Sequence, residues 1–289
     1  MATSAEPGKN AGTIVIFTDF SNAALNATNY AAALARQLNV SRLQICYSEH
    51  TPTTMEMQSQ IIILTEQEHQ RHIEQLRTLK DKLQPRLNKG IVIESYIDQR
   101  PLDEIVNSYP EGQSPELVVM GIAGKDLLER TFIGSNTIRV ARITPIPLLI
   151  VPEHSKFKTI ENVVFACDLK KVSKTTPAVA IKRMVNILGA KLSILNVDHH
   201  EEHFNPDTLT EMNSLYQLWE NEQPEYHYTD NKDIAKGVMD FADEHQMQMV
   251  IAVPKKYGFF EGLFHTSLTK KLAYHIHVPL LLFKEEKQK

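Results

Sequence analysis

Residues 13–19 read TIVIFTD and residues 162–168 read NVVFACD. Both stretches are β-branched and apolar until they end at an aspartate, which predicts a strand in each. After the first stretch, Ser21 is a good helix cap, and alanines and leucines follow it at helical spacing. The two aspartates, Asp19 and Asp168, lie 149 positions apart. The sequence therefore predicts one strand–helix unit that is written twice.

Further apolar runs alternate with helical patterns through both halves of the chain. The remaining strands of the first half are expected at residues 43–47, 91–97, 117–120 and 147–151, and the second half repeats this order up to residues 279–283. Strands that alternate with helices favour a parallel sheet covered on both faces, with ligands beyond the carboxyl ends of the strands. The predicted fold class is therefore α/β.

The repeat also predicts the domain boundaries. A first domain is expected at residues 1–152, a polar linker at residues 153–160 and a second domain at residues 161–289. A chain of 289 residues is long enough for two domains that each bury a core. Ser135 and Ser267 lie only 132 positions apart, so the second copy is shorter, and we expect the loss around its second helix.

The composition is that of an ordinary globular protein. Hydrophobic residues make up 42% and charged residues 23%, and the net charge of −4 argues against a nucleic-acid partner. Residues 1–12 lack the pattern of a secretory signal, and no apolar run is long enough to predict a membrane span. Cys46 and Cys167 both fall inside apolar runs, which predicts buried thiols. These features together favour the cytoplasm.

A glycine-containing loop follows the strand at residues 117–120. Gly121 and Gly124 come first, and after nine residues Gly134, Ser135, Asn136 and Thr137 open a helix. Glycine lets backbone N–H groups approach an anion, and a helix start adds unpaired N–H donors and a positive dipole end. The pattern is typical of a phosphate-binding loop. The alternative is that these glycines only make turns and that Ser135 only caps the helix.

The spacing of the three glycines, together with the aspartate after the first strand, resembles the ATP-binding subgroup of the universal stress proteins. The resemblance extends over nearly the whole chain, as in a tandem two-domain member. It implies that each domain is a Rossmann-like, adenine nucleotide alpha hydrolase-like fold, with a five-stranded, mainly parallel sheet flanked by helices. Carried over by position, it implies the nucleotide-binding residues Asp19, Met120, Gly121, Gly124, Gly134, Ser135, Asn136 and Thr137. Asn136 replaces the apolar residue common in the family, and we expect it to act through its backbone.

The second half lacks the three glycines. Val253, Lys256 and Thr266 stand at the corresponding positions, although Asp168 and Ser267 remain. A side chain at each position blocks close approach of the backbone to a ligand, so the second domain is not expected to bind ATP. The loop at residues 257–264 is apolar instead. It is expected either to pack against the other domain or to form a surface for an apolar ligand or a partner.

No catalytic group or metal site is predicted. Residues 199–203 read HHEEH, which contains a metalloprotease pattern, but they fall in a predicted loop and not on a helix. No nucleophile with a neighbouring base can be assigned. The resemblance permits at most slow hydrolysis of ATP.

The resulting functional prediction is a cytoplasmic stress-response protein that binds ATP, alone or with Mg²⁺, in its first domain and has a regulatory or protective role. The alternative is a nucleotide-independent interaction protein, or a binder of apolar ligands, that uses the loop of the second domain. Each half ends in an apolar strand led by a proline, at residues 147–151 and 279–283. We expect these strands to pair and cover each other's edges in an internal pseudo-dimer, while further homodimerisation stays open.

Overall fold

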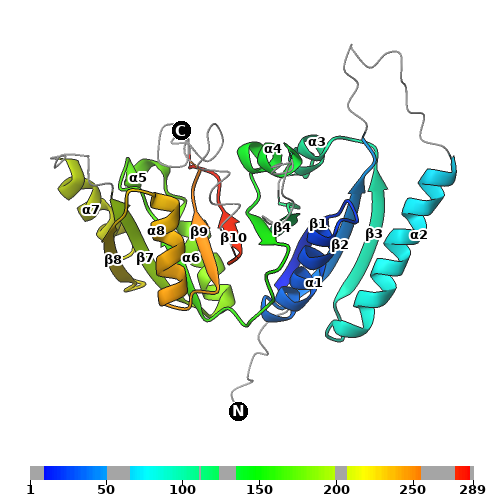
Figure 1. Ribbon diagram of the computed structural model, residues 1–289, viewed down its shortest axis with the longest axis horizontal. Helices are drawn as coiled ribbons and strands as arrows, with labels where there is room; N and C mark the ends of the chain where they lie inside the picture. The colour runs from blue at the N-terminus through cyan, green and yellow to red at the C-terminus, as the bar shows by residue number, and fades with distance from the viewer. Residues whose placement is uncertain are drawn as a thin grey trace, which may run out of the picture.

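The computed structural model describes residues 10–50, 66–110, 112–123, 135–198, 207–254 and 277–286. Their strands form a ten-stranded sheet with helices on both faces (Figure 1). The strands of the first half are β1 (Asn10–Phe17), β2 (Val40–Ser48), β3 (Val92–Asp98), β4 (Leu117–Ile122) and β5 (Leu148–Pro152). Those of the second half are β6 (Asn162–Ala166), β7 (Lys191–Asp198), β8 (Glu225–Asp230), β9 (Met249–Ala252) and β10 (Leu280–Leu282).

The helices alternate with these strands. The first half contains α1 (Asn22–Gln37), α2 (Glu66–Leu83) with a short 3₁₀ turn η2 (Gln84–Arg86) after it, α3 (Leu102–Asn107) and α4 (Ser135–Ile143). The second half contains α5 (Val172–Thr175), α6 (Ala178–Leu188), α7 (Asp207–Leu218) and α8 (Ile234–Glu244). This alternation confirms the predicted α/β fold class.

The two halves have the same strand order and meet at one antiparallel pair. The sheet order is β3-β2-β1-β4-β5 in the first half and continues as β10-β9-β6-β7-β8 in the second. Pairing is parallel within each half, and β5 and β10 pair antiparallel, with Leu149 opposite Leu281. The two apolar strands that end the halves thus lie side by side, and each covers an edge of the other.

The core consists of two layers, one on each face of the sheet. Alternate residues of β1 face opposite layers: Ile14 and Ile16 belong to the layer that contains α1, α2 and α6, whereas Val15 and Phe17 belong to the layer that contains α3, α4 and α8. Both layers contain residues from both halves, so the core runs across the β5–β10 junction.

Three other sequence predictions can be compared with the structure. Cys46 and Cys167 are both buried, as predicted. Part of the expected shortening lies at the second helix, because α2 has 18 residues and its counterpart α7 has 12. Within the described ranges, no helix combines the length and the apolar character needed to cross a membrane.

Candidate functional site

The turn between β1 and α1 holds Asp19 at the carboxyl end of the sheet. The backbone N–H of Ser21 donates to the Asp19 Oδ1 atom at 3.0 Å, and the N–H of Ala24 donates to the Ser21 hydroxyl oxygen at 3.3 Å. Ser21 is thus the N-cap of α1, as predicted. The Asp19 side chain is exposed. The carboxylate is therefore fixed by its own turn but accessible to a ligand.

Gly121 lies where the start of α1 crosses the end of β4. A Cβ atom at this position would meet the carbonyl oxygen of Ala23 at 2.3 Å and the backbone nitrogen of Ala24 at 2.7 Å. These are backbone atoms of the first turn of α1, so they cannot move aside without displacing the helix. This packing is enough by itself to require glycine, whatever contact Gly121 makes with a ligand. The first turn of α1 thus links Asp19 to Gly121.

The other predicted site residues differ in burial, and two of them lie outside the described residues. The Met120 side chain is 6% exposed in the core, so Met120 could meet a ligand only through its backbone. At the start of α4, Asn136 is exposed and Thr137 is buried, while Ser135 is the first residue of the helix. Gly124 and Gly134 lie outside the described residues.

An ion pair fixes α4 relative to α3. The Arg139 Nε atom lies 3.0 Å from the Asp103 Oδ1 atom, and Arg139 also contacts the Asn136 Oδ1 atom at 3.5 Å. Asp103 belongs to the first turn of α3, so the pair joins the two helices near the start of α4. The orientation of the helix that opens with Ser135 is therefore set by side chains as well as by its packing.

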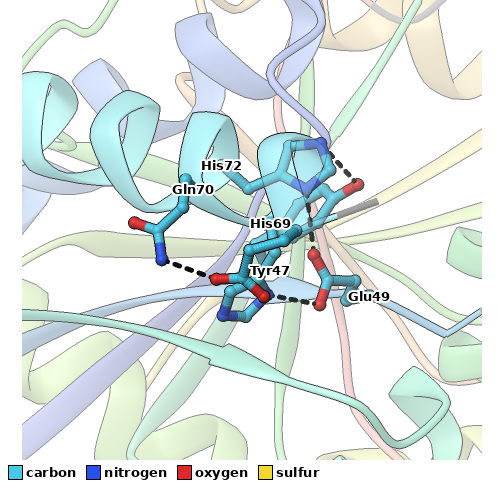
Figure 2. A network of polar contacts seen from close by, with 6 residues as sticks. Tyr47, Glu49, His69, Gln70 and His72 are labelled. Atoms are coloured by element: carbon cyan, nitrogen blue, oxygen red, sulfur yellow. Dashed lines mark hydrogen bonds and ion pairs between the residues drawn. The ribbon is translucent and has the colours of Figure 1, made fainter. Parts of the chain in front are cut away.

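A buried carboxylate lies beside this edge, at the end of β2. Glu49 accepts hydrogen bonds from the Nδ1 atoms of His69 at 2.8 Å and His72 at 3.0 Å, both on α2 (Figure 2). The Glu49 side chain is only 5% exposed. Burial raises the pKa of this carboxyl, but the hydrogen bonds from His72 and His69 outweigh burial and hold the pKa below its usual value. Glu49 is therefore ionised at neutral pH and ties α2 to the sheet.

The same cluster includes an aromatic stack. The rings of Phe20 and Tyr47 are 5.1 Å apart, and those of Tyr47 and His72 are 4.4 Å apart. The Tyr47 hydroxyl lies 3.4 Å from the His72 Nε2 atom (Figure 2), so a carboxylate, an imidazole and a hydroxyl form a chain. Burial, with the charges of Glu49 and Asp19, raises the pKa of Tyr47. The hydroxyl stays protonated, so this chain does not supply an activated nucleophile.

Sequence reasoning missed this cluster. Its signal is present, because Tyr47 and Glu49 alternate at the end of a predicted strand and His69 and His72 lie three apart, a spacing that puts two side chains on one face of a helix. Nothing in that spacing says that the helix crosses this strand end. In the part of the chain that the structure describes, no group of three histidine, cysteine or acidic residues is arranged to hold a metal ion.

Comparison with known proteins places this arrangement in a family. The fold is that of an α/β protein of the Rossmann-like class. Residues 11–152 match the model of the universal stress protein family. Residues 11–152 therefore form a domain of the universal stress protein family. No curated protein matches the sequence.

Solved structures share the fold at low sequence identity. A universal stress protein from Archaeoglobus fulgidus DSM 4304 matches with a TM-score of 0.67 and 15% identity, over 95% of this chain and 99% of its own. A functionally unknown protein from Pseudomonas aeruginosa PAO1 matches with a TM-score of 0.57 and 11% identity, over 96% of this chain and 94% of its own. A universal stress protein in complex with cAMP matches 43% of this chain and 95% of its own at 15% identity, but its TM-score of 0.31 is too low to support an argument.

Proposed function

We propose that this protein binds ATP, alone or with Mg²⁺, at the carboxyl edge of its first half and acts as a regulatory or stress-protective universal stress protein. The observation that carries the proposal is the contact between Gly121 and the first turn of α1. Because Gly121 has no side chain, the end of β4 approaches the turn that holds the exposed Asp19. A ligand at this edge would meet both the carboxylate and the chain that leaves the end of β4.

The proposed roles follow the chemistry of each group. Asp19 accepts hydrogen bonds from the adenosine part of the ligand. The backbone N–H groups of residues 120–124 and Gly134, with the start of α4, hold the phosphates. At that helix start, Ser135 and Thr137 contribute hydroxyls and Asn136 contributes its backbone N–H.

We further propose that the two halves are separate domains, at residues 1–152 and 161–289, that act as an internal pseudo-dimer in the cytoplasm. The segment between them is held by α1, which supports a fixed arrangement. The Asn26 Nδ2 atom donates to the carbonyl oxygens of Pro152 at 2.8 Å and Ser155 at 2.9 Å, and the Gln37 Nε2 atom donates to that of Ile160 at 2.8 Å. ATP binding in the first domain can therefore change the position of the segment that leads to the second domain.

Strong catalysis is not part of the proposal. Beside the edge, Glu49, His72 and Tyr47 form a chain of carboxylate, imidazole and hydroxyl. Burial and the charge of Glu49 raise the pKa of Tyr47, so its hydroxyl stays protonated. Slow hydrolysis of ATP by a positioned water stays compatible with the site. We therefore infer that the ligand acts through occupancy, by changing the conformation or the partners of the protein.

Calorimetric titration with ATP tests the proposal, and the repeat supplies a matched control. The full chain should bind one ATP. Asp19→Ala should weaken binding at least about tenfold, because an aspartate contact to the ligand is lost. Asp168→Ala changes the corresponding aspartate of the second half and should leave binding unchanged.

Binding of two ATP molecules, the absence of binding, or an equal loss in the two aspartate variants would contradict the proposal. The alternative function, a ligand-independent contact surface, rests on residues 257–264, which lie outside the described residues. Small molecules that copurify with the protein separate the two functions, because only the first predicts an adenine nucleotide among them.

A further inference from the structure

A cavity lies at the edge of the second half where the strands begin. Its volume is about 610 Å³, within the usual range of small-molecule sites. The wall includes Asn162, Lys191 and Glu225, which are the first residues of β6, β7 and β8. Ligands of parallel α/β sheets usually lie beyond the carboxyl ends of the strands, so this cavity is distinct from the site proposed for ATP.

A completely buried tryptophan forms part of the wall. Trp219 is 0% exposed, and its indole N–H has no hydrogen-bond partner among the described residues. Buried indole N–H groups normally have an acceptor. The ring is held in place by Phe165, whose centroid is 6.0 Å away, and by the Lys182 ammonium, 5.5 Å from the ring centroid. The wall residue Trp219 therefore carries a buried donor that lacks an acceptor.

An ion pair stands next to this tryptophan. The Lys182 Nζ atom lies 2.7 Å from the Glu222 Oε2 atom, and the two side chains are 22% and 24% exposed. Both residues line the cavity. Pairs that water still reaches contribute little net stability, so a ligand that offers its own charges can exchange with this one at small cost. The Glu222 Oε2 atom is itself buried, so a ligand that displaces Lys182 from it must bring an ammonium of its own.

The charges of the wall are balanced. Two lysines, Lys182 and Lys191, and two glutamates, Glu222 and Glu225, line the same cavity. A ligand of one sign would satisfy one member of the Lys182–Glu222 pair and repel the other. A ligand with both charges satisfies both. Its carboxylate has two oxygens, which suit the Lys182 ammonium and the neighbouring indole N–H together.

We propose that this cavity binds a small zwitterion of the amino-acid or dipeptide class, with its carboxylate toward Lys182 and Trp219 and its ammonium toward Glu222. The site belongs to the second half alone, because Trp219 is the one tryptophan of the chain. The half without the three glycines thereby has a ligand of its own. This inference does not depend on ATP binding by the first half.

The same tryptophan makes the test direct. Intrinsic tryptophan fluorescence of the full chain reports only on Trp219. Glycine, L-serine, L-glutamine and glycylglycine are each titrated to millimolar concentration. At least one should cause a saturable change in emission, and the single indole N–H signal in a nitrogen-15 NMR spectrum should shift with the same dissociation constant.

Variants then identify the contacts. Lys182→Met and Glu222→Gln should each weaken binding at least about tenfold, because each removes one charged contact. Lys236→Met is the matched control, since this lysine pairs with Asp240 on the exposed side of α8 and does not line the cavity. Thermal unfolding of each variant checks that it is folded.

Three results would overturn the proposal. The first is the absence of a saturable change with any of the four probes in the unmodified chain, by either fluorescence or NMR. The second is binding that is unchanged in both Lys182→Met and Glu222→Gln. The third is an equal response to acetate or glycerol, which carry one charge or none.

Discussion

The two halves of this protein differ in how the end of one strand is packed, β4 in the first half and β9 in the second. In the first half, the next-to-last residue of β4 is Gly121, and the first turn of α1 lies directly on it. In the second half, the pairing register places Val253 where the first half has Gly121, and this valine is buried at 2% exposure. The strand end can therefore be covered by a helix at backbone contact or by its own side chain.

The helices differ in the corresponding way. α1 runs unbroken for 16 residues from its cap at Ser21. In the second half the chain enters α5 through Lys171 in a left-handed conformation, makes only four helical residues and starts again as α6 after Pro177. Val253 and Val172 of α5 belong to the same core layer. Loss of the glycine is thus accompanied by a different first helix, so it is more than a local change in a loop.

The aspartate turns have stayed alike. The N–H of Ser21 donates to Asp19 at 3.0 Å, and the N–H of Lys170 donates to Asp168 at 3.1 Å. Asp168 is partly buried, whereas Asp19 is exposed. An aspartate at this position is therefore explained by the turn alone, and the glycine distinguishes the halves better than the aspartate does.

Gly121→Val should have the largest effect, because it gives the first half the residue that the second half has at the corresponding position, Val253. The added side chain meets backbone atoms of α1 and must displace the helix. We expect the free energy of unfolding to fall by about 3 kcal/mol, and ATP binding to be lost. Urea unfolding and calorimetry measure the two effects.

The control for this change is Gly112→Ala. Gly112 has a positive φ of 78°, unlike Gly121, and a Cβ atom there would meet nothing within 4 Å. Its cost should be limited to backbone strain of about 1 kcal/mol, with ATP binding intact. If Gly121→Val is no more destabilising than this control, close packing of α1 is not the reason for the glycine.

Val253→Gly is the reverse experiment and should come second. It removes a buried side chain and adds backbone freedom to the unfolded chain, which together should lower stability by about 2 kcal/mol. It should not create a second ATP site, because the first helix of this half is still broken before Pro177. Calorimetry should still give one ATP per chain. A second equivalent site would show that the glycine alone decides nucleotide binding.

Glu49→Gln tests whether the hydrogen bonds of Glu49 hold α2 against the end of β2. Sequence reasoning did not predict these bonds. The amide offers one acceptor in place of two, so one histidine loses its bond, and we expect a loss of about 1–2 kcal/mol at neutral pH. Glu94→Gln, at an exposed position on β3, is the control and should cost less than about 0.5 kcal/mol.

The pH dependence gives a second measure of the same cluster. The folded protein holds the pKa of Glu49 below that of the unfolded chain, which is about 4.3. The stabilisation is therefore complete above the unfolded pKa and is lost as the pH falls through the lower, folded pKa. Urea unfolding of Glu49→Gln should show a smaller loss of stability in acid than the unmodified chain. Parallel pH profiles would mean that Glu49 is not the group responsible.

Sequence reasoning recovered what depends on local pattern. The apolar runs and the cap at Ser21 were sufficient to predict the strands, the α/β class and the start of α1, because these features are set by neighbours along the chain. It did not recover contacts between distant segments. The packing role of Gly121, the clamp of Glu49 on α2 and the cavity at Trp219 all depend on which helix crosses which strand end. Residue spacing carries no signal for such crossings.

Arg183→Ala should have the smallest effect and sharpens the question of what joins the halves. The Arg183 Nη2 atom lies 2.5 Å from the Glu116 Oε1 atom, so this ion pair connects α6 to the segment before β4. The Arg183 side chain is 58% exposed, and such pairs contribute about 0.5 kcal/mol or less.

Leu281→Ala, by contrast, truncates a side chain that is 1% exposed on β10 opposite Leu149 and should cost about 3 kcal/mol. Thermal and urea unfolding should therefore show one cooperative transition in Arg183→Ala and a split or broadened one in Leu281→Ala. If the arginine variant separates the halves instead, the junction depends on surface charge and not on the buried β5–β10 pair.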